Sequence, residues 1–370
     1  MSAVARPELA VDGLEVAVYE VPTDEPESDG TLAWDATTVV VVRCRAGGTV
    51  GVGYTYGESA VAALIESKLR HVVVGRSPLD TGALWLAMWS SIRNAGRPGV
   101  GMMAVSAVDI ALWDLKGRLL GLSVVDLLGA AREVVPIYGS GGFCSYSLHR
   151  LQEQLGGWVE QGIPRVKMKT SRRPDDDPAR LDAVRKAIGE RPELLVDANG
   201  ALSRKQALAW AERFRTEWGV SWFEEPVSSA DFEGLRLLRD RGPAGLDIAA
   251  GEYGFVLADF RNLVDAGAVD CLQADVSRCG GITGLLRVSS LCDIHNIDLS
   301  GHCVPNVSAH PLAAALHLRH LEYFHDHVRI ERMFLDGALE PVGGCLRPDR
   351  SRPGFGLELK EADAEPYRVG

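Results

Sequence analysis

The sequence predicts an α/β protein in which a closed, TIM-like barrel of β-α units follows an N-terminal α+β domain. From about residue 135, short apolar runs alternate with amphipathic segments typical of helices, as at 177–190, 204–218 and 230–241. This alternation indicates a parallel sheet. Roughly eight such runs fit before residue 335, which favours a closed barrel over an open sheet.

The first 132 residues have a different sequence pattern, which indicates an α+β domain. The run 37–57 is typical of two strands around a turn at 46–48. A helix is expected over about 101–121, where apolar side chains recur at steps of three and four residues. The tail after residue 336 is rich in Gly, Pro and Arg, and we expect it to pack back on the first domain. The predicted domains are therefore 1–132, 133–335 and 336–370.

Composition narrows the class of function. The net charge of −11 argues against nucleic acid as the main partner, because binding to phosphates needs a basic face. No run approaches the roughly 20 apolar residues of a membrane helix, and the N-terminus has no signal-peptide core, so no membrane partner is expected. The seven cysteines are scattered without a CxxC pair, which favours reduced thiols and a cytoplasmic location.

Three carboxylates recur at the spacing of one barrel unit. Asp197 ends the run ELLVD, Glu224 ends SWFE and Glu252 ends LDIAAGE. The steps are 27 residues (224 minus 197) and 28 residues (252 minus 224). Acids at equivalent strand ends converge at the mouth of a barrel, where active sites of this fold lie. Because carboxylates do not gather without a counter-charge, a hard divalent cation such as Mg²⁺ is the expected occupant.

The other predicted strands also end on polar side chains. Lys167 and Lys169 lie two apart in GIPRVKMKT and therefore point to one face, with Val166 and Met168 toward the surrounding helices. By the same period, Asn199 shares the face of Asp197. The next strand ends carry Asp275, His302 and Glu322. Seven successive strand ends thus carry an ionisable residue.

Each of these residues also has an ordinary structural explanation. The lysines are compatible with solvated surface positions, Glu224 with a helix start, Asp197 with a turn, and His302 with a hydrogen-bonded core histidine. Similar explanations apply to Glu252 as a loop residue, Asp275 as a helix cap and Glu322 as a structural acid. The shared spacing favours one common site, because separate structural causes do not produce a period.

Three further motifs are weaker candidates. The cluster His325-Asp326-His327 resembles a metal pair but matches no strand end. Cys303 beside His302 is a possible nucleophile, although no base is evident for it. Gly280-Gly281 precedes a predicted helix and is a weak candidate for phosphate binding.

Together the motifs resemble those of the enolase superfamily, in its mandelate racemase subgroup, over nearly the whole chain. AVSAVDIALWDLKGRLLGLSVVDLLG is similar to the helix signature of the capping domain in that family. KMK, DAN, EEP, GE, the Asp of QADVSRCGGITG and the His of SGH are similar to its barrel motifs, in the same order. The resemblance implies a (β/α)7β barrel with an N-terminal capping domain that shapes specificity and is completed by the C-terminal tail.

The resemblance also implies residue roles. One Mg²⁺ would be held by Asp197, Glu224 and Glu252, and one oxygen of a small-molecule carboxylate substrate would bind that metal. Lys169 would be the base on one face of the substrate, with His302 as acid or base on the other. The supporting residues would be Asp275, which orients His302; Lys167, which holds the anionic intermediate; Glu322, which hydrogen-bonds the carboxylate; and Asn199, a neighbour of the metal site. A lysine serves as base only if its pKa falls, and we expect Lys167 and the metal to lower the pKa of Lys169.

Members of the subgroup with these residues resemble acid-sugar dehydratases, so dehydration of an aldonate or aldarate to a 2-keto-3-deoxy acid is the leading hypothesis. The alternative is a racemase or epimerase of a 2-hydroxy acid. A Schiff-base aldolase using one of the lysines and a non-catalytic barrel are further alternatives. In the cap, Trp34, Tyr54 and Tyr56 are candidate substrate contacts, with core packing as the other explanation. The resemblance also implies a homo-oligomer.

Overall fold

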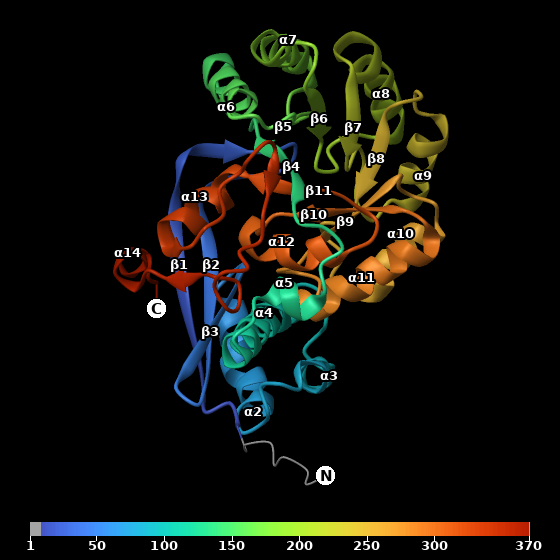
Figure 1. Cartoon of the computed structure of the whole chain (residues 1–370). Helices are drawn as coiled ribbons and strands as arrows, with labels where there is room; N and C mark the ends of the chain where they lie inside the picture. The colour runs from blue at the N-terminus through green and yellow to red at the C-terminus, as the bar shows by residue number, and fades with distance from the viewer. Residues whose placement is uncertain (1–8, 370) are drawn as a thin grey trace.

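The structure, a computed structural model, describes residues 9–369 and consists of a capping domain, a barrel and a C-terminal segment (Figure 1). The capping sheet is antiparallel, in the order β1 (Gly13–Ser28), β2 (Ala33–Ala46) and β3 (Thr49–Tyr56). The two expected strands are β2 and β3, and β1 is a third. Because β1 pairs with β2 along almost its full length, the sheet presents a wide apolar face to the helices.

Five helices follow the capping sheet, and α4 covers one face of it. They are α1 (Ala60–Leu64), α2 (Arg70–Val73), α3 (Thr81–Ser91), α4 (Val100–Leu120) and α5 (Val124–Leu128), with a π-helical turn at Ile65–Leu69 between α1 and α2. The expected helix is α4, which lies directly against β3. Gly53 permits this approach, since a Cβ there would overlap the carbonyl oxygen of Ala107 on α4.

Eight parallel strands form the barrel, and pairing of the last with the first closes it. They are β4 (Val135–Gly141), β5 (Arg165–Lys169), β6 (Glu193–Asp197), β7 (Val220–Glu224), β8 (Asp247–Ala250), β9 (Cys271–Asp275), β10 (Asp298–His302) and β11 (Leu318–Phe324). The closed barrel expected from the sequence is therefore confirmed. Side chains alternate along each strand: Val166 and Met168 join the core under the helices, whereas Lys167 and Lys169 point inward.

A helix follows each strand. They are α6 (Leu148–Glu160), α7 (Asp177–Ile188), α8 (Arg204–Trp218), α9 (Phe232–Arg241), α10 (Leu257–Asp265), α11 (Gly281–His295), α12 (Pro305–Ala314) and α13 (His325–Phe334). Figure 1 shows α13 beside the capping strands, and residues of α13 face β2 and β3 across an apolar layer. The helix after the last strand therefore joins the barrel to the capping sheet.

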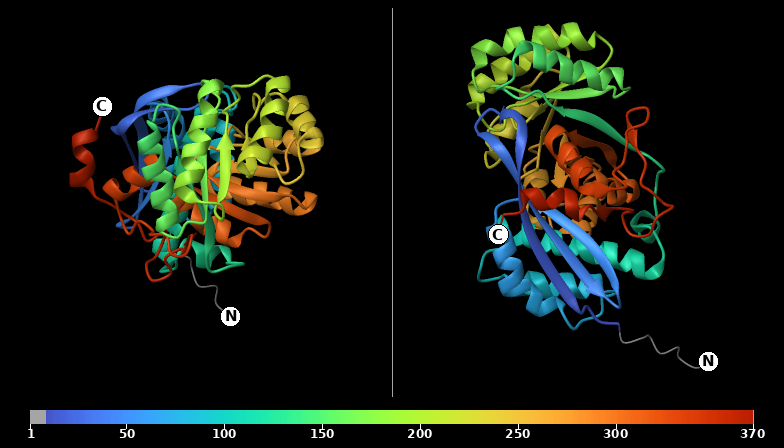
Figure 2. Two further views of the ribbon diagram at one scale, coloured as in Figure 1. Left: turned by 90° about the horizontal axis from the view of Figure 1, so that it is seen from above. Right: turned by 90° about the vertical axis from the view of Figure 1, so that its left-hand side faces the viewer.

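The β1–β2 hairpin reaches from the capping helices to the barrel (Figure 2). Its tip lies against the loops that follow β5 and β6, because a Cβ at Gly30 would lie 3.0 Å from the carbonyl oxygen of Thr170 and would overlap that of Ala198. The hairpin thus covers part of the barrel face on which the strands end.

The C-terminal segment contacts both domains. It contains β12 (Leu335–Asp336), β13 (Cys345–Leu346), β14 (Glu358–Leu359) and α14 (Glu361–Ala364). β13 pairs with barrel strand β4, whereas the amide of Phe355 donates to Asp114 of α4 and that of Val369 to the carbonyl of Val18 on β1. All seven cysteines are free thiols, and no helix within residues 9–369 has the length and apolar character to cross a membrane.

Candidate active site

Most of the ionisable residues singled out in the sequence end a barrel strand. Lys169, Asp197, Glu224, Asp275 and His302 are each the last residue of their strand. Two positions differ from the expectation. Glu252 lies two residues beyond the end of β8, after Gly251, whose φ of 136° turns the chain. Glu322 lies inside β11, two residues before its end at Phe324.

Three carboxylates meet at this face of the barrel. Ligand oxygens of Asp197, Glu224 and Glu252 lie within 4.8 Å of one another, and all three side chains are buried. Burial raises the pKa of Glu224 to about 8, although the neighbouring Lys167 acts in the opposite direction. Glu252 Oε2 is buried and accepts no hydrogen bond within the described part of the chain, with His302 Nε2 at 3.3 Å. Such a set of hard, crowded oxygen donors fits Mg²⁺.

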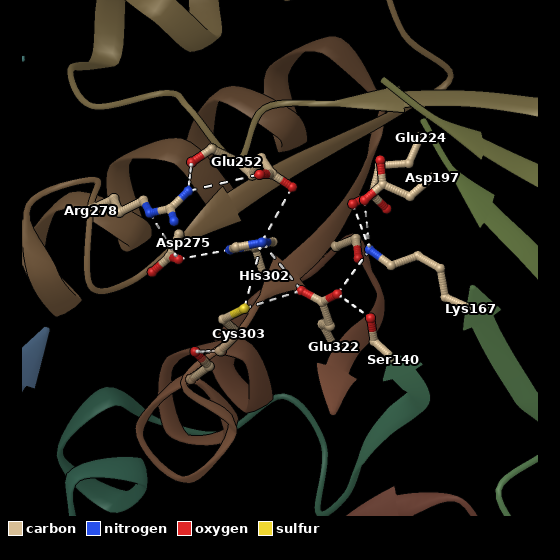
Figure 3. A network of polar contacts seen from close by, with 12 residues as sticks. Ser140, Lys167, Asp197, Glu224, Glu252, Asp275, Arg278, His302, Cys303 and Glu322 are labelled. Atoms are coloured by element: carbon tan, nitrogen blue, oxygen red, sulfur yellow. Dashed lines mark hydrogen bonds and ion pairs between the residues drawn. The ribbon is translucent and has the colours of Figure 1, made fainter. Parts of the chain in front are cut away.

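Two buried lysines border the carboxylates. Lys167 Nζ lies 2.5 Å from Glu224 Oε1 and 2.8 Å from Glu322 Oε1 (Figure 3). Lys169 Nζ donates to Asp197 Oδ2 at 2.5 Å. Burial and Lys167 act to lower the pKa of Lys169, but Asp197 and the other acids outweigh them and raise it well above its usual value. Lys167 thus acts in the expected direction, but in the protein chain by itself the carboxylates use Lys169 as their counter-charge. A cation between the carboxylates would relieve that demand. The expected low pKa of Lys169 requires the metal as well and stays a prediction.

A histidine and an aspartate form a dyad on another side of the carboxylate cluster. His302 Nδ1 lies 2.7 Å from Asp275 Oδ2, and Asp275 Oδ1 accepts from both the amide and the hydroxyl of Ser277 at 2.7 Å. The dyad fixes the imidazole so that Nε2 faces Glu252 and Glu322, at 3.3 and 3.4 Å. Burial acts to lower the pKa of His302, but Cys303, Glu252 and Glu322 raise it well above its usual value.

Cys303 lies closer to a base than the sequence suggested. Its Sγ is 3.5 Å from His302 Nε2 and 3.3 Å from Glu322 Oε2, so the expectation that no base is near is wrong (Figure 3). The cause is the left-handed backbone of Cys303, with φ of 51°, which turns its side chain back toward the site. Burial raises the pKa of this thiol, which favours a neutral donor to Glu322 over a thiolate nucleophile.

The three candidate substrate contacts in the cap, Trp34, Tyr54 and Tyr56, lie in different environments. Tyr54 and Tyr56 are buried between the capping sheet and α13, and Tyr56 stacks on His327 with ring centroids 3.4 Å apart. The expected substrate contact is not supported for these tyrosines, because packing accounts for their burial. Trp34 is half-buried, donates from Nε1 to Glu27 Oε2 at 2.9 Å and packs edge-on against Phe143, which follows β4.

Asn199 lies beside the carboxylates, as expected from its spacing. Its amide donates to Asp197 Oδ1 at 2.8 Å, and its own Oδ1 is buried without a partner in the described chain. The backbone is left-handed at Asn199 (φ 46°) and at Glu225 (φ 37°), so the chain turns sharply directly after two of the carboxylates.

In two of the three weaker motifs, the groups expected to bind a phosphate or a metal contact other parts of the protein. The start of α11 at Gly280-Gly281 is occupied by a carboxylate, since Asp109 of α4 accepts from the amide of Thr283 at 2.9 Å, and no room remains there for a phosphate. His325 lies against Asp24 at 3.1 Å, whereas His327 stacks on Tyr56. The histidines of this cluster thus point to different partners and do not form a pair.

Comparison with known proteins identifies the family. Residues 150–363 match the model of the enolase C-terminal domain-like family, and residues 14–129 match the mandelate racemase / muconate lactonizing enzyme N-terminal domain. The chain belongs to the enolase superfamily, in its mandelate racemase subgroup. A mandelate racemase/muconate lactonizing enzyme-like protein from Rubrobacter xylanophilus has a similar structure, with 61% identity, a TM-score of 0.96, and coverage of 97% of this chain and 100% of that one.

Two other superfamily members carry a named activity. The 3,6-anhydro-alpha-L-galactonate cycloisomerase of Streptomyces coelicolor is 32% identical over 365 residues, which span 94% of this chain and 97% of that protein. The L-talarate/galactarate dehydratase of Salmonella typhimurium, crystallised with Mg and L-lyxarohydroxamate, has 27% identity and a TM-score of 0.89, and the match covers 100% of this chain and 95% of that one. Relatives of this superfamily member are thus dehydratases and cycloisomerases of sugar acids.

Three further residues contact the site, although their sequence pattern did not mark them as candidates. Ser140 of β4 donates to Glu322 Oε1 at 2.6 Å. Arg278 lies 3.6 Å from Asp275 and 3.9 Å from Glu252. Glu225 is buried beside the three acids, and burial raises its pKa well above its usual value. A polar residue in the apolar run VPIYGSG was the available signal for Ser140, but Arg278 and Glu225 are placed by loops that have no period.

Proposed function

We propose that the protein abstracts the proton α to the carboxylate of an acid sugar, in a Mg²⁺-dependent reaction, and dehydrates an aldonate or aldarate to a 2-keto-3-deoxy acid. One observation carries the proposal: Lys169 Nζ and His302 Nε2 approach the same buried carboxylate cluster from β5 and β10, strands that are not neighbours in the barrel. A substrate carboxylate at the cluster would then lie between a base and an acid.

Asp197, Glu224 and Glu252 would hold the metal, since their oxygens are the crowded hard donors that Mg²⁺ prefers. A bound divalent cation supplies charge that offsets the second negative charge on a deprotonated carboxylate substrate. Lys167 supplies a second positive charge from within the barrel. It lies between Glu224 and Glu322 and is fully buried, so its ammonium is rigidly placed and little screened by water.

Lys169 and His302 transfer the protons in this reaction. Lys169, as a neutral amine, takes the proton from the α-carbon, and the electron pair of that bond enters the carboxylate π-system. His302 gives its Nε2 proton to the β-hydroxyl, the carbon–oxygen bond breaks, and water leaves. The resulting enol tautomerises to the 2-keto acid. Asp275 accepts from Nδ1 and so stabilises the doubly protonated imidazolium from which His302 gives its Nε2 proton. Glu322 is held by Ser140 and Lys167. Burial acts to raise its pKa, but Lys167 and His302 lower it below its usual value, so Glu322 would donate to the substrate carboxylate only after it takes up a proton when the substrate binds.

A second candidate is cycloisomerisation of a lactone or anhydro sugar acid. The observation that favours it is the 32% identity with the 3,6-anhydro-alpha-L-galactonate cycloisomerase over 94% of this chain. Cycloisomerisation differs from dehydration in the oxygen that leaves the β-carbon. In cycloisomerisation this oxygen belongs to a ring, so it stays attached to the product. Racemisation or epimerisation remains a third outcome, in which the proton returns on the opposite face.

One screen separates these outcomes. The protein is incubated with Mg²⁺ and a panel of aldonates, aldarates and their lactones, in water and in D₂O, and the products are analysed by mass and for 2-keto acids. Dehydration predicts a keto acid lighter than its substrate by one water. A keto acid of unchanged mass indicates cycloisomerisation. Deuterium at the α-carbon without a keto acid indicates racemisation or epimerisation and contradicts the leading proposal.

A further inference from the structure

A cavity of about 780 Å³ lies between the capping domain and the barrel, apart from the carboxylate site. The capping side contributes α3 and the loop 92–99, and the barrel side contributes the start of α10 and the first half of α11. Its apolar lining includes Met102, Phe255 and Val256. Cavities of this size at domain interfaces are typical of binding sites for small molecules. None of its lining residues is one of the predicted catalytic or metal-binding residues.

Four side chains at this cavity form one continuous stack. The rings of Trp85 and Trp89 are stacked, with centroids 5.3 Å apart and planes inclined by 14°. The Arg97 guanidinium lies 4.1 Å from the Trp89 ring, and that of Arg287 lies 5.0 Å from the Trp85 ring. Hydrogen bonds fix the stack, since Trp85 Nε1 donates to the carbonyl of Gly280 at 2.9 Å and Arg97 Nε donates to that of Trp89 at 3.2 Å.

The two arginines of this stack differ from the other stacked arginines of the protein. Six arginines in the described chain lie over an aromatic ring. Four of them also have a carboxylate partner within 4.0 Å: Arg150, Arg213, Arg278 and Arg319. Among residues 9–369, Arg97 and Arg287 have none, and neither has Arg93 at the rim of the same cavity. Other described arginines also lack a carboxylate partner, but three such guanidiniums line this one cavity.

We propose that this cavity binds a small organic dianion that has one carboxylate or phosphate group at Arg97 and another at Arg287, the two ends of the stack, and whose apolar body rests on Phe255 and Val256. A guanidinium that stacks through its face keeps its N–H edge free for an oxyanion. Because the stack already orders both arginines, little side-chain entropy is lost when the anion binds. The site lies on both domains, so the bound anion holds the cap against the barrel. The inference does not depend on the proposed reaction.

Anilinonaphthalene sulfonate is a suitable probe, because it is an aromatic anion and its fluorescence reports binding. Titration of the full chain at constant ionic strength is expected to show one saturable site, and inorganic phosphate is expected to compete where chloride does not. The double variant Arg97→Ala/Arg287→Ala is expected to bind the probe at least about tenfold more weakly. Phosphate is also expected to raise the Tm of the wild type but not that of the variant.

Arg213 provides the matched control. Its guanidinium also stacks on tryptophan, 4.6 Å from the Trp210 ring, but its edge is occupied by Glu217 at 2.7 and 3.0 Å. Arg213→Ala is expected to leave probe binding unchanged. If the double variant fails to fold, the single variants Arg97→Gln and Arg287→Gln decide the question in its place.

Three results would overturn the proposal. They are the absence of saturable binding, equal weakening by Arg213→Ala, and wild-type affinity in the Arg97 and Arg287 variants. A second copy of the chain is the alternative occupant of the cavity. Sedimentation equilibrium tests it, because this method measures the mass of the assembly. If the variants reduce the mass of the assembly and leave probe affinity unchanged, the cavity is a subunit contact and the proposal is wrong.

Discussion

Asp275 Oδ2 lies 2.7 Å from His302 Nδ1, and this contact fixes which nitrogen of the imidazole faces the carboxylate site. Asp275 is itself held by the amide and hydroxyl of Ser277, so the dyad is rigid before any substrate binds. In the proposed reaction, His302 Nε2 transfers the proton and Asp275 is a positioning residue.

Asp275→Asn is therefore expected to reduce kcat by at least about a hundredfold, because a neutral amide does not stabilise the imidazolium from which His302 gives its Nε2 proton. Circular dichroism and Tm should stay close to the wild type, since Asn keeps the size of the side chain. Asp298→Asn, at the exposed start of the same strand as His302, is the control and should retain activity. Wild-type kcat in Asp275→Asn would show that the dyad has no part in the reaction.

Variants of Lys169 and His302 should separate two steps of the reaction, abstraction of the α-proton and loss of water. In His302→Asn, dehydration is expected to fall at least about a hundredfold while exchange of the substrate α-proton with D₂O continues, because Lys169 remains as base. In Lys169→Met, both exchange and dehydration should be lost. NMR of the substrate in D₂O measures both. Exchange that persists in Lys169→Met at the wild-type rate would contradict the assignment of the base, and Lys205→Met on the exposed face of α8 is the control.

Mg²⁺ is expected to stabilise the fold as well as to support activity. Binding at 100 times Kd adds about 2.7 kcal/mol to the free energy of unfolding, which appears as a rise in Tm. Glu252→Gln removes one donor charge and should abolish most of this rise, whereas Glu233→Gln, an exposed acid on α9, should not. EDTA should remove both the rise and the activity. Full activity in EDTA would favour the Schiff-base alternative.

A buried acid in the cap predicts a pH dependence of stability. Burial, and next the nearby Asp326, raise the pKa of Glu27 to about 9, and the folded protein thus binds this proton more tightly than the unfolded chain does. The contribution of Glu27 is therefore full below about pH 4.5 and is lost as the pH rises toward 9. Glu27→Gln mimics the neutral acid and keeps an oxygen for Trp34 Nε1.

The variant should match the wild type near pH 4 and exceed it at pH 8 by on the order of 5 kcal/mol in the free energy of unfolding, since each pH unit between the two pKa values contributes about 1.4 kcal/mol. Denaturant unfolding at both pH values measures this. The exposed neighbour Glu25 supplies the control Glu25→Gln. A difference that is equal at pH 4 and pH 8 would show that Glu27 does not carry the titration.

The period of the barrel made the site predictable. Strand, loop and helix repeat at a nearly constant length, so Asp197, Glu224 and His302 could be assigned to strand ends from spacing and alternation alone. Glu252 and Glu322 were placed near the correct level but not at the residue, because Gly251 extends one loop and β11 runs two residues past its acid.

Contacts between distant segments were not predictable in the same way. The approach of Cys303 to His302 depends on one left-handed residue, and the pKa of Lys169 depends on the balance of charges around it. Tyr54 and Tyr56 have hydroxyls suited to a polyol, but only the packing of α13 on the capping sheet shows that they are core residues. The stack of Trp85 and Trp89 depends likewise on how the two domains meet.

The position of a bound metal tests the central claim most directly. A crystal grown with Mn²⁺ in place of Mg²⁺ should show one strong anomalous peak among the carboxylates of Asp197, Glu224 and Glu252, with Lys169 Nζ and His302 Nε2 on different sides of it. A peak elsewhere, or none at saturating Mn²⁺, would contradict the account.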